Sequence, residues 1–336
     1  MRDSNIGWCH HSLNFWWGCN YVSAECQGCY AKTIMENKGL EFNLVRLTKS
    51  WRQAFVFNAD ARRRRKCALV FTCSMSDFFH EAADRWRPDA WDAIGRCRNL
   101  VWLILTKRPE RIADCLPTDW SAERYPHVWL GTTVGMRASY PRMDILRNIP
   151  AALRFLSLEP LLEDLHDINL KGYGWLLVGG MSGDLHKEKP MSIRWAANLY
   201  DRAQALDIPY LFKQVSAPKS EWGINALGLY LDRRANGEPW PRLNRRGGKL
   251  FEKFNQFPMK VDIVRQFPNT PLPLMPLDTD NGRRFTWEEW DHYRNSWAQH
   301  KLLDLGGIPD PVLFPPPDPG CLFGSLAGWE GHRVCE

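Results

Sequence analysis

Seven short apolar runs recur between residues 14 and 212, and most are followed by a stretch with helical spacing. The runs are apolar at successive positions, which is typical of parallel strands covered on both faces. Strands are therefore expected at 14–17, 68–73, 101–105, 128–131, 154–158, 175–178 and 209–212. Helices are expected at 31–38, 88–97, 109–116, 141–148 and 192–206. This alternation predicts an α/β fold with a parallel sheet.

Polar residues and glycines follow the ends of the expected strands. They are Asp77, Lys107, Arg108, Glu159, Gly179, Gly180, Lys213 and Gln214. The carboxyl ends of parallel strands meet at one rim, which carries the active site in a β/α barrel. A doubly wound open sheet gives the same pattern at one edge. Because nearly every strand end is polar, we expect a (β/α) barrel, complete or partial.

The alternation ends after Val215, in a chain of 336 residues. We expect residues 1–215 to form the barrel. Residues 216–267 are expected to be an irregular basic segment that closes it. Residues 268–336 are rich in proline and are expected to form a tail with one helix, at 286–303.

Three cysteines lie close together near the N-terminus. Cys19, Cys26 and Cys29 have the spacing C-x6-C-x2-C. Three thiolates can hold a [4Fe–4S] cluster and leave one iron open to a substrate or cosubstrate. A closed zinc site needs four ligands, and Cys9 or His10 can supply the fourth. Soft thiolates suit both metals, so the spacing leaves the cluster and the zinc site open.

The composition indicates the setting of the protein. No run of 18 apolar residues occurs, so no membrane span is expected. The first residues do not have the pattern of a signal peptide. Cysteines outside the N-terminal group are scattered, which fits buried free thiols in a reducing cytoplasm.

The net charge of +6 permits a nucleic-acid partner. Tryptophan is abundant, with 17 residues, and many of them lie beside arginine. The pairs Trp51–Arg52 and Trp86–Arg87 can stack on bases. They can equally cover the edge of the core or make cation–π contacts within the protein.

Several segments together resemble one family. The matching segments are 18–31, 74–80, 105–109, 129–131, 157–161, 179–180 with 182–183, and 212–214. They resemble a phage-associated, three-cysteine, radical-SAM-like family of uncharacterised proteins. The cysteine loop and polar rim are also similar in architecture to radical S-adenosylmethionine (SAM) enzymes, whose usual spacing is C-x3-C-x2-C. The family pattern has an acid near Gly135 and another at Met181.

The resemblance implies a barrel of radical SAM type, with a [4Fe–4S] cluster and SAM as cofactors. Cys19, Cys26 and Cys29 would hold the cluster, and SAM would chelate its fourth iron. In that resemblance, Asp77 would accept from the SAM amino group, and Lys107 and Arg108 would bind its carboxylate. Glu159 would accept from the ribose hydroxyls, and Gly179 and Gly180 would let the backbone approach the ligand closely. Lys213 and Gln214 would bind the substrate.

The rim residues also have structural interpretations. Asp77 can cap a helix, and Glu159 can belong to a turn. Lys107 and Arg108 can pair with Glu110. Two functional classes therefore stay open. One is a radical SAM enzyme that acts on a nucleic acid or nucleotide. The other is a metal-stabilised (zinc or Fe–S) protein that binds a nucleic acid or a protein partner without turnover.

Overall fold

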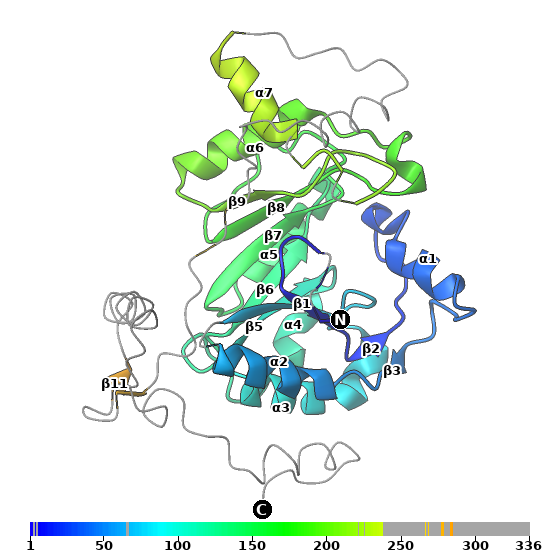
Figure 1. Cartoon of the computed structure of the whole chain (residues 1–336), viewed down its shortest axis with the longest axis vertical. Helices are drawn as coiled ribbons and strands as arrows, with labels where there is room; N and C mark the ends of the chain where they lie inside the picture. Colours follow the sequence, from blue (N-terminus) through cyan, green and yellow to red (C-terminus); the bar gives the residue numbers. More distant parts are fainter. Residues whose placement is uncertain are drawn as a thin grey trace, which may run out of the picture.

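The chain folds around a seven-stranded parallel sheet that curls into half of a barrel (Figure 1). The computed structural model describes residues 1–237 apart from 3, 5, 65, 66, 221 and 225, and also residues 266, 268, 277–278 and 283–284. The strands of the sheet lie side by side in chain order. They are β1 (His11–Leu13), β4 (Ala68–Thr72), β5 (Leu100–Thr106), β6 (Val128–Thr133), β7 (Leu153–Leu158), β8 (Trp175–Val178) and β9 (Tyr210–Phe212).

The order of the strands decides between the two predicted sheet types. A doubly wound sheet reverses its strand order part-way. Here the order β1-β4-β5-β6-β7-β8-β9 has no reversal, and every neighbouring pair is parallel. The prediction of a partial β/α barrel is therefore confirmed, and the doubly wound alternative is wrong.

The first strand begins earlier than predicted. β1 pairs with β4, whereas β2 (Trp16–Trp17) pairs with β3 (Arg46–Leu47) in a separate antiparallel ribbon. Asn14 lies between β1 and β2, and its side-chain Oδ1 accepts a hydrogen bond from the N–H of Met75 at 2.7 Å. The first strand of the sheet is therefore 11–13 and not the predicted 14–17, of which only Trp16–Trp17 form a strand, in the separate ribbon.

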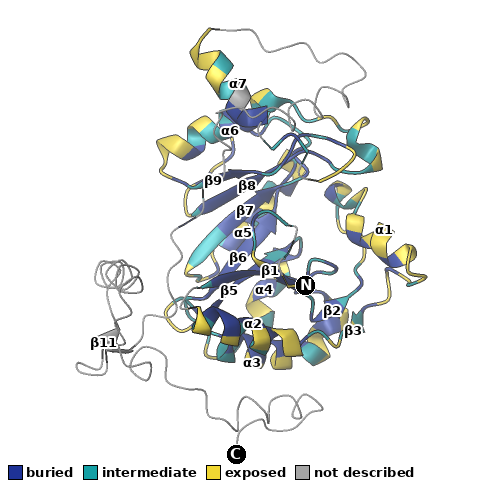
Figure 2. Cartoon of the chain, viewed as in Figure 1, coloured by how far each residue is buried: buried dark blue, intermediate teal, exposed yellow. Residues whose placement is uncertain are grey.

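Side chains of the sheet alternate between two buried faces. One face carries residues such as Trp102 and Leu130 and packs against helices in the main core. The concave face carries Trp129 and Trp175, and Trp8 from the N-terminal segment fills the half-barrel beside them. Figure 2 shows the strands buried and the helices exposed along their outer surfaces.

Of the seven α-helices that the structure describes, five lie close to their predicted positions, whereas the second and the last were not predicted. The helices are α1 (Tyr30–Glu36), α2 (Arg52–Arg63), α3 (Arg87–Arg96), α4 (Ile112–Cys115), α5 (Tyr140–Arg147), α6 (Ile193–Ala205) and α7 (Ala226–Ala235). In Figure 1, α1 stands apart from the helices that cover the sheet. In the part of the chain that the structure describes, no helix is long and apolar enough to cross a membrane.

The segment after the barrel differs from its prediction. Residues 216–267 were expected to be irregular, but α7 forms within them and packs against α6. Most of the basic part of this segment lies outside the described residues. So does the tail with its expected helix at 286–303, except for residue 268 and the antiparallel pair β10 (Leu277–Asp278) and β11 (Arg283–Arg284).

Gln266 covers the free edge of the sheet. Its N–H donates to the Tyr210 carbonyl at 2.8 Å, and its Oε1 accepts from the Tyr210 N–H at 3.0 Å. Its carbonyl accepts from the indole N–H of Trp175 at 3.0 Å. Because an uncovered edge strand leaves backbone groups unpaired, Gln266 completes β9.

The tryptophan–arginine pairs serve the fold. Trp51 is buried, and its indole N–H donates to the Phe15 carbonyl at 2.9 Å. The guanidinium of Arg85 lies 4.3 Å from the ring centre of Trp86. Arg87 is buried and donates to two backbone carbonyls. These contacts support the internal interpretation of the pairs rather than base stacking.

Candidate functional site

One cavity of about 400 Å³ lies at the carboxyl ends of the strands, under the loop that carries the three cysteines. This volume falls in the usual range of ligand sites. Predicted residues that line it are Cys19, Cys26, Cys29, Asp77, Lys107, Arg108, Glu159, Gly180 and Lys213. The fold thus brings together residues that are almost 200 positions apart in the chain. Gly179 and Gln214 are not part of the lining.

Cys19 is held by the buried side chain of Arg108. The Nη1 of Arg108 donates to Cys19 Sγ at 3.6 Å, and its Nη2 donates to the side-chain oxygen of Asn20. His80 Nε2 donates to the same oxygen at 3.1 Å, because His80 Nδ1 accepts from a backbone N–H. Burial raises the pKa of the Cys19 thiol to about 11, with Asp77 adding to the rise and Arg108 opposing it. A metal would have to displace that proton.

Cys26 follows a buried acid, Glu25, in the 3₁₀ turn η1 (Ala24–Cys26). Glu25 Oε1 accepts from the Gly135 N–H at 3.1 Å and from the Ser139 hydroxyl. Arg142 Nη1 lies 3.3 Å from both carboxylate oxygens. Burial disfavours ionisation, but the bonds from Ser139 and Arg142 outweigh it and hold the pKa of Glu25 below its usual value. Glu25 therefore fastens the cysteine loop to the end of β6 and to α5.

Cys29 is the N-cap residue of α1. The buried face of α1, which includes Ala31, packs against Phe42 and Met75 in a small apolar cluster. Cys19 and Cys29 both contact this cluster. The three thiols thus have different anchors, and each anchor ties the loop to the rim of the half-barrel.

Asp77 joins the ends of β4 and β5. Its carboxylate accepts from the N–H groups of Phe79 and Lys107, each at 2.9 Å, and from the Thr106 hydroxyl at 2.7 Å. Arg108 Nη1 lies 3.5 Å away. These bonds use most of its capacity as an acceptor. The structural interpretation therefore accounts for Asp77 better than the role of acceptor for the SAM amino group.

The two cations after β5 have different surroundings. Arg108 pairs with Asp77 and Glu81, so the predicted pair with Glu110 is wrong. Lys107 lines the cavity, and its ammonium group has no hydrogen bond or ion pair with any residue that the structure describes. Lys107 is therefore available to an anionic ligand.

Glu159, Lys213 and Gln214 bind one another. Lys213 Nζ pairs with Glu159 Oε2, and Gln214 Nε2 donates to Glu159 Oε1 at 2.6 Å. The side chain of Gln214 is fully buried, so it orients Glu159 and does not reach a substrate as predicted. A Cβ on Gly179 would lie 3.2 Å from the Lys213 Cβ, which places Gly179 behind this cluster.

Two glycines at the rim allow close packing within the chain. A Cβ on Gly180 would lie 2.3 Å from the N atom of Ser216. Gly180 was expected to let a ligand approach the backbone closely, but here the backbone of Ser216 occupies that space. A Cβ on Gly135 would lie 2.1 Å from the carbonyl oxygen of Pro160. No acid fits at that position, and the carboxylate of Glu25 lies beside it instead.

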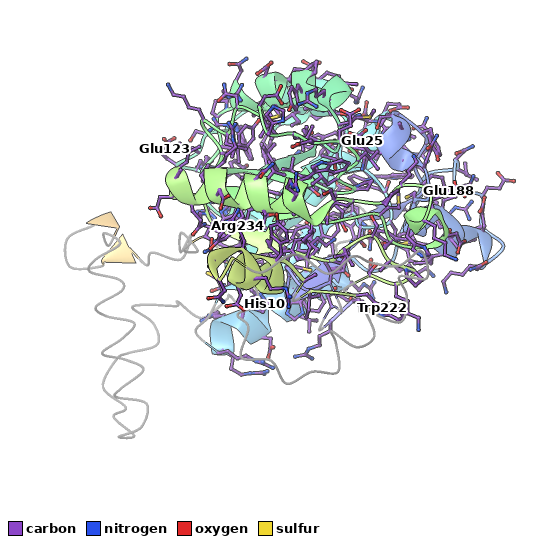
Figure 3. The ribbon with its side chains drawn as sticks, turned by 90° about the horizontal axis from the view of Figure 1, so that it is seen from above. His10, Glu25, Glu123, Glu188, Trp222 and Arg234 are labelled. Atoms are coloured by element: carbon purple, nitrogen blue, oxygen red, sulfur yellow. The ribbon has the colours of Figure 1, made fainter. Side chains whose placement is uncertain are left out.

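The alternative fourth ligands for zinc lie outside the cavity. Cys9 Sγ donates to the Ile6 carbonyl at 3.7 Å, and His10 Nδ1 accepts from the Leu69 N–H at 2.9 Å. Figure 3 shows His10 well separated from Glu25, the neighbour of Cys26. Among the described residues, no three His, Cys, Asp or Glu side chains are gathered closely enough to hold a metal ion.

A further thiol, Cys73, lines the cavity at the end of β4. It belongs to the main core and is almost fully buried. Burial raises its pKa to about 12, although the backbone of Phe15 and Trp16 opposes this rise. Cys73 is therefore a thiol of the core that stays protonated at neutral pH.

A protein family described as "Protein of unknown function (DUF5131)" matches residues 3–266. This match covers most of the chain. The chain belongs to the DUF5131 family. The expected resemblance to an uncharacterised family is confirmed to that extent, and the match ends at the residue that covers the edge of β9. No curated protein and no solved structure matches the chain.

Sequence reasoning missed several residues of the DUF5131 site. Glu25 precedes Cys26 directly, but its partner Gly135 is 110 residues away, so no local pattern indicates the contact. The role of Asn20, whose side-chain oxygen accepts hydrogen bonds from both Arg108 and His80, was also not predicted. Thr133 in β6 and Ser157 in β7 also line the cavity. No role was predicted for them, although Thr133 follows the predicted strand at 128–131 and Ser157 lies in the matching segment 157–161.

Proposed function

We propose that this DUF5131 protein is an iron–sulfur enzyme of the radical SAM type, as the resemblance to phage-associated radical-SAM-like proteins implies. The observation that carries the proposal is the cavity that Cys19, Cys26 and Cys29 share, with Cys9 and His10 outside it. Three cysteines leave one iron of a [4Fe–4S] cluster without a protein ligand.

The side chains that contact the thiols and their loop suit such a cluster. Arg108 donates to Cys19 Sγ, and hydrogen bonds to sulfur tune the potential of iron–sulfur centres. Asn20 and Asp77 fix the orientation of that guanidinium. Glu25 holds the turn that precedes Cys26. These contacts position the ligands before any cofactor binds.

The rim offers partners for the charged and hydroxyl groups of SAM. Lys107 is the cation we assign to its carboxylate, through a charge-assisted hydrogen bond. Each carboxylate oxygen of Glu159 accepts one bond, from Lys213 or Gln214, and can accept another from a ribose hydroxyl. With SAM bound, the reduced cluster supplies the electron that cleaves a C–S bond of SAM. Lys213 is left as the cation beside the substrate, which we propose is a nucleic acid or nucleotide.

The decisive assay uses anaerobically reconstituted protein that is reduced with dithionite, given SAM and analysed for 5′-deoxyadenosine. We expect product from the wild type and none from Cys29→Ala. Lys107→Ala should weaken SAM binding by about ten- to a hundredfold, because a charge-assisted bond contributes about 1.5–3 kcal/mol. The exposed Lys171, outside the cavity, provides the matched control Lys171→Ala. Absence of both 5′-deoxyadenosine and SAM binding in the wild type would leave a metal-stabilised binding protein without turnover.

A further inference from the structure

Two buried hydroxyls face the cavity without a protein partner. Thr133 is 1% exposed and Ser157 is 3% exposed, and both line the cavity. Neither side chain makes a hydrogen bond to any residue in the described part of the chain. Neither hydroxyl oxygen is among the described side-chain atoms that are fully buried without a partner, so both oxygens open onto the cavity. They are therefore accessible to a polar ligand bound there.

The register of the sheet places the two hydroxyls side by side. Thr133 in β6 lies directly opposite Ser157 in β7. Both occupy positions of the concave face, since they follow Trp129 and Phe155 at even spacing along their strands. Adjacent strands are about 4.8 Å apart, so the pair can contact two neighbouring polar atoms of one ligand.

The neighbouring threonine shows what a structural hydroxyl looks like here. Thr132 precedes Thr133 and points to the opposite face, where its hydroxyl donates to the Thr106 carbonyl at 2.9 Å. The Thr106 hydroxyl in turn donates to Asp77 at 2.7 Å. Buried hydroxyls on the helix-covered face are therefore hydrogen-bonded within the protein, whereas those of Thr133 and Ser157 are not.

Apolar and aromatic side chains line another part of the cavity. They include Trp8, Phe71 and Leu105, and the ring centres of Trp8 and Phe71 are 4.5 Å apart with their planes tilted by 47°. A ligand that suits these side chains and the two hydroxyls has an apolar ring face and a neutral polar edge. Serine and threonine hydroxyls both donate and accept hydrogen bonds, so they can bind an edge that carries donors and acceptors together.

We propose that the pair Thr133–Ser157 binds the edge of a nucleobase whose face lies against these aromatic side chains. Bases combine a π face that stacks on aromatic side chains with an edge of mixed donors and acceptors. This inference names the substrate class of the proposed enzyme and rests on that function for its catalytic meaning. Base binding itself does not require the three cysteines.

The test is calorimetric titration of the full-length, anaerobically reconstituted protein. One arm uses adenosine, guanosine, cytidine and uridine, and the other uses ten-nucleotide single strands. Thr133→Val and Ser157→Ala should each weaken base binding about tenfold, because each removes one bond to the ligand. Thr132→Val is the matched control, with unchanged base binding.

Thermal unfolding separates a ligand contact from a structural role. Thr133→Val should keep or raise the melting temperature, because its hydroxyl has no partner in the folded protein. Thr132→Val should lower it by a few degrees. If Thr133→Val misfolds, Ser157→Ala carries the binding test.

Three results would overturn the inference: no base bound at millimolar concentration, wild-type affinity in both variants, or loss of SAM affinity in place of base affinity. Tighter binding of strands than of nucleosides would support it and assign the base to a nucleic acid. Tighter binding of nucleosides than of strands would also support the inference, and would indicate that the bound base belongs to a free nucleotide. Iron content and 5′-deoxyadenosine, measured on the same samples, report separately on the proposed function.

Discussion

Replacing Glu25 by alanine should release the cysteine loop from the half-barrel. The carboxylate is fully buried and accepts hydrogen bonds from the Gly135 N–H, the Ser139 hydroxyl and Arg142. Removing one partner of a buried charged pair costs about 3–5 kcal/mol. Arg142 Nη1 keeps its bond to the Thr133 carbonyl at 3.0 Å, so we expect the lower end, about 3 kcal/mol.

The loss of the Glu25 contacts should increase local opening of the cysteine loop and should also lower the global free energy of unfolding. About 3 kcal/mol corresponds to a rise of roughly a hundredfold in the open population of the loop. Alkylation of Cys26 by N-ethylmaleimide, followed by peptide mass spectrometry on the metal-free protein, measures this opening. Urea unfolding measures the global change. Glu25→Gln keeps the side-chain size and should give an intermediate loss.

Glu36→Ala in α1 is the matched control. Glu36 is exposed and lies 3.8 Å from Lys32, so its loss should cost less than about 0.5 kcal/mol. The proposed anchoring of the loop is wrong if the free energy of unfolding of Glu25→Ala lies within about 1 kcal/mol of the wild-type value and Cys26 is alkylated at the wild-type rate.

Three further substitutions test the packing. Gly135→Ala should lower the free energy of unfolding by about 2–3 kcal/mol, because the new Cβ would lie 2.1 Å from a backbone carbonyl oxygen. Its control, Gly95→Ala in open space on α3, should raise the free energy of unfolding by up to about 1 kcal/mol. Gln266→Ala should lower the free energy of unfolding by about 1–2 kcal/mol through its lost side-chain bond to β9, whereas exposed Gln53→Ala should be neutral. Burial raises the pKa of Asp60, but the surrounding arginines outweigh it and lower the pKa overall. Its contribution, about 1 kcal/mol, is therefore present above its usual pKa of 3.8. In urea unfolding at several pH values, the difference between the wild type and Asp60→Asn should vanish as the pH falls below 3.8.

The strands from β4 onward were predictable because each is buried on both faces of a parallel sheet. A strand that is buried on both faces is apolar at successive positions, and such a run can be recognised directly in the sequence. β1 was missed because His11–Leu13 is short and the more apolar Trp16–Trp17 lies just after it. Which of them joins the sheet is a matter of pairing with β4, about 60 residues away. Such a contact between distant residues is not encoded in the local sequence.

The rim of the site was predictable from position, but its contacts were not. Parallel strands end at one edge, so Lys107, Glu159 and Lys213 had to lie near one another. Whether Lys213 would bind substrate or Glu159 depends on how β7 and β9 are brought together through β8. The same is true of Glu25, whose partners follow β6.

Metal analysis tests the central claim most directly. After anaerobic reconstitution with iron and sulfide, the three-cysteine account predicts iron and sulfide in cluster stoichiometry for the wild type and for Cys9→Ala. It predicts loss of both in Cys26→Ala, measured together with the electron paramagnetic resonance signal of the reduced protein. Stoichiometric zinc without iron, or loss of metal in Cys9→Ala, would contradict a cluster held by Cys19, Cys26 and Cys29.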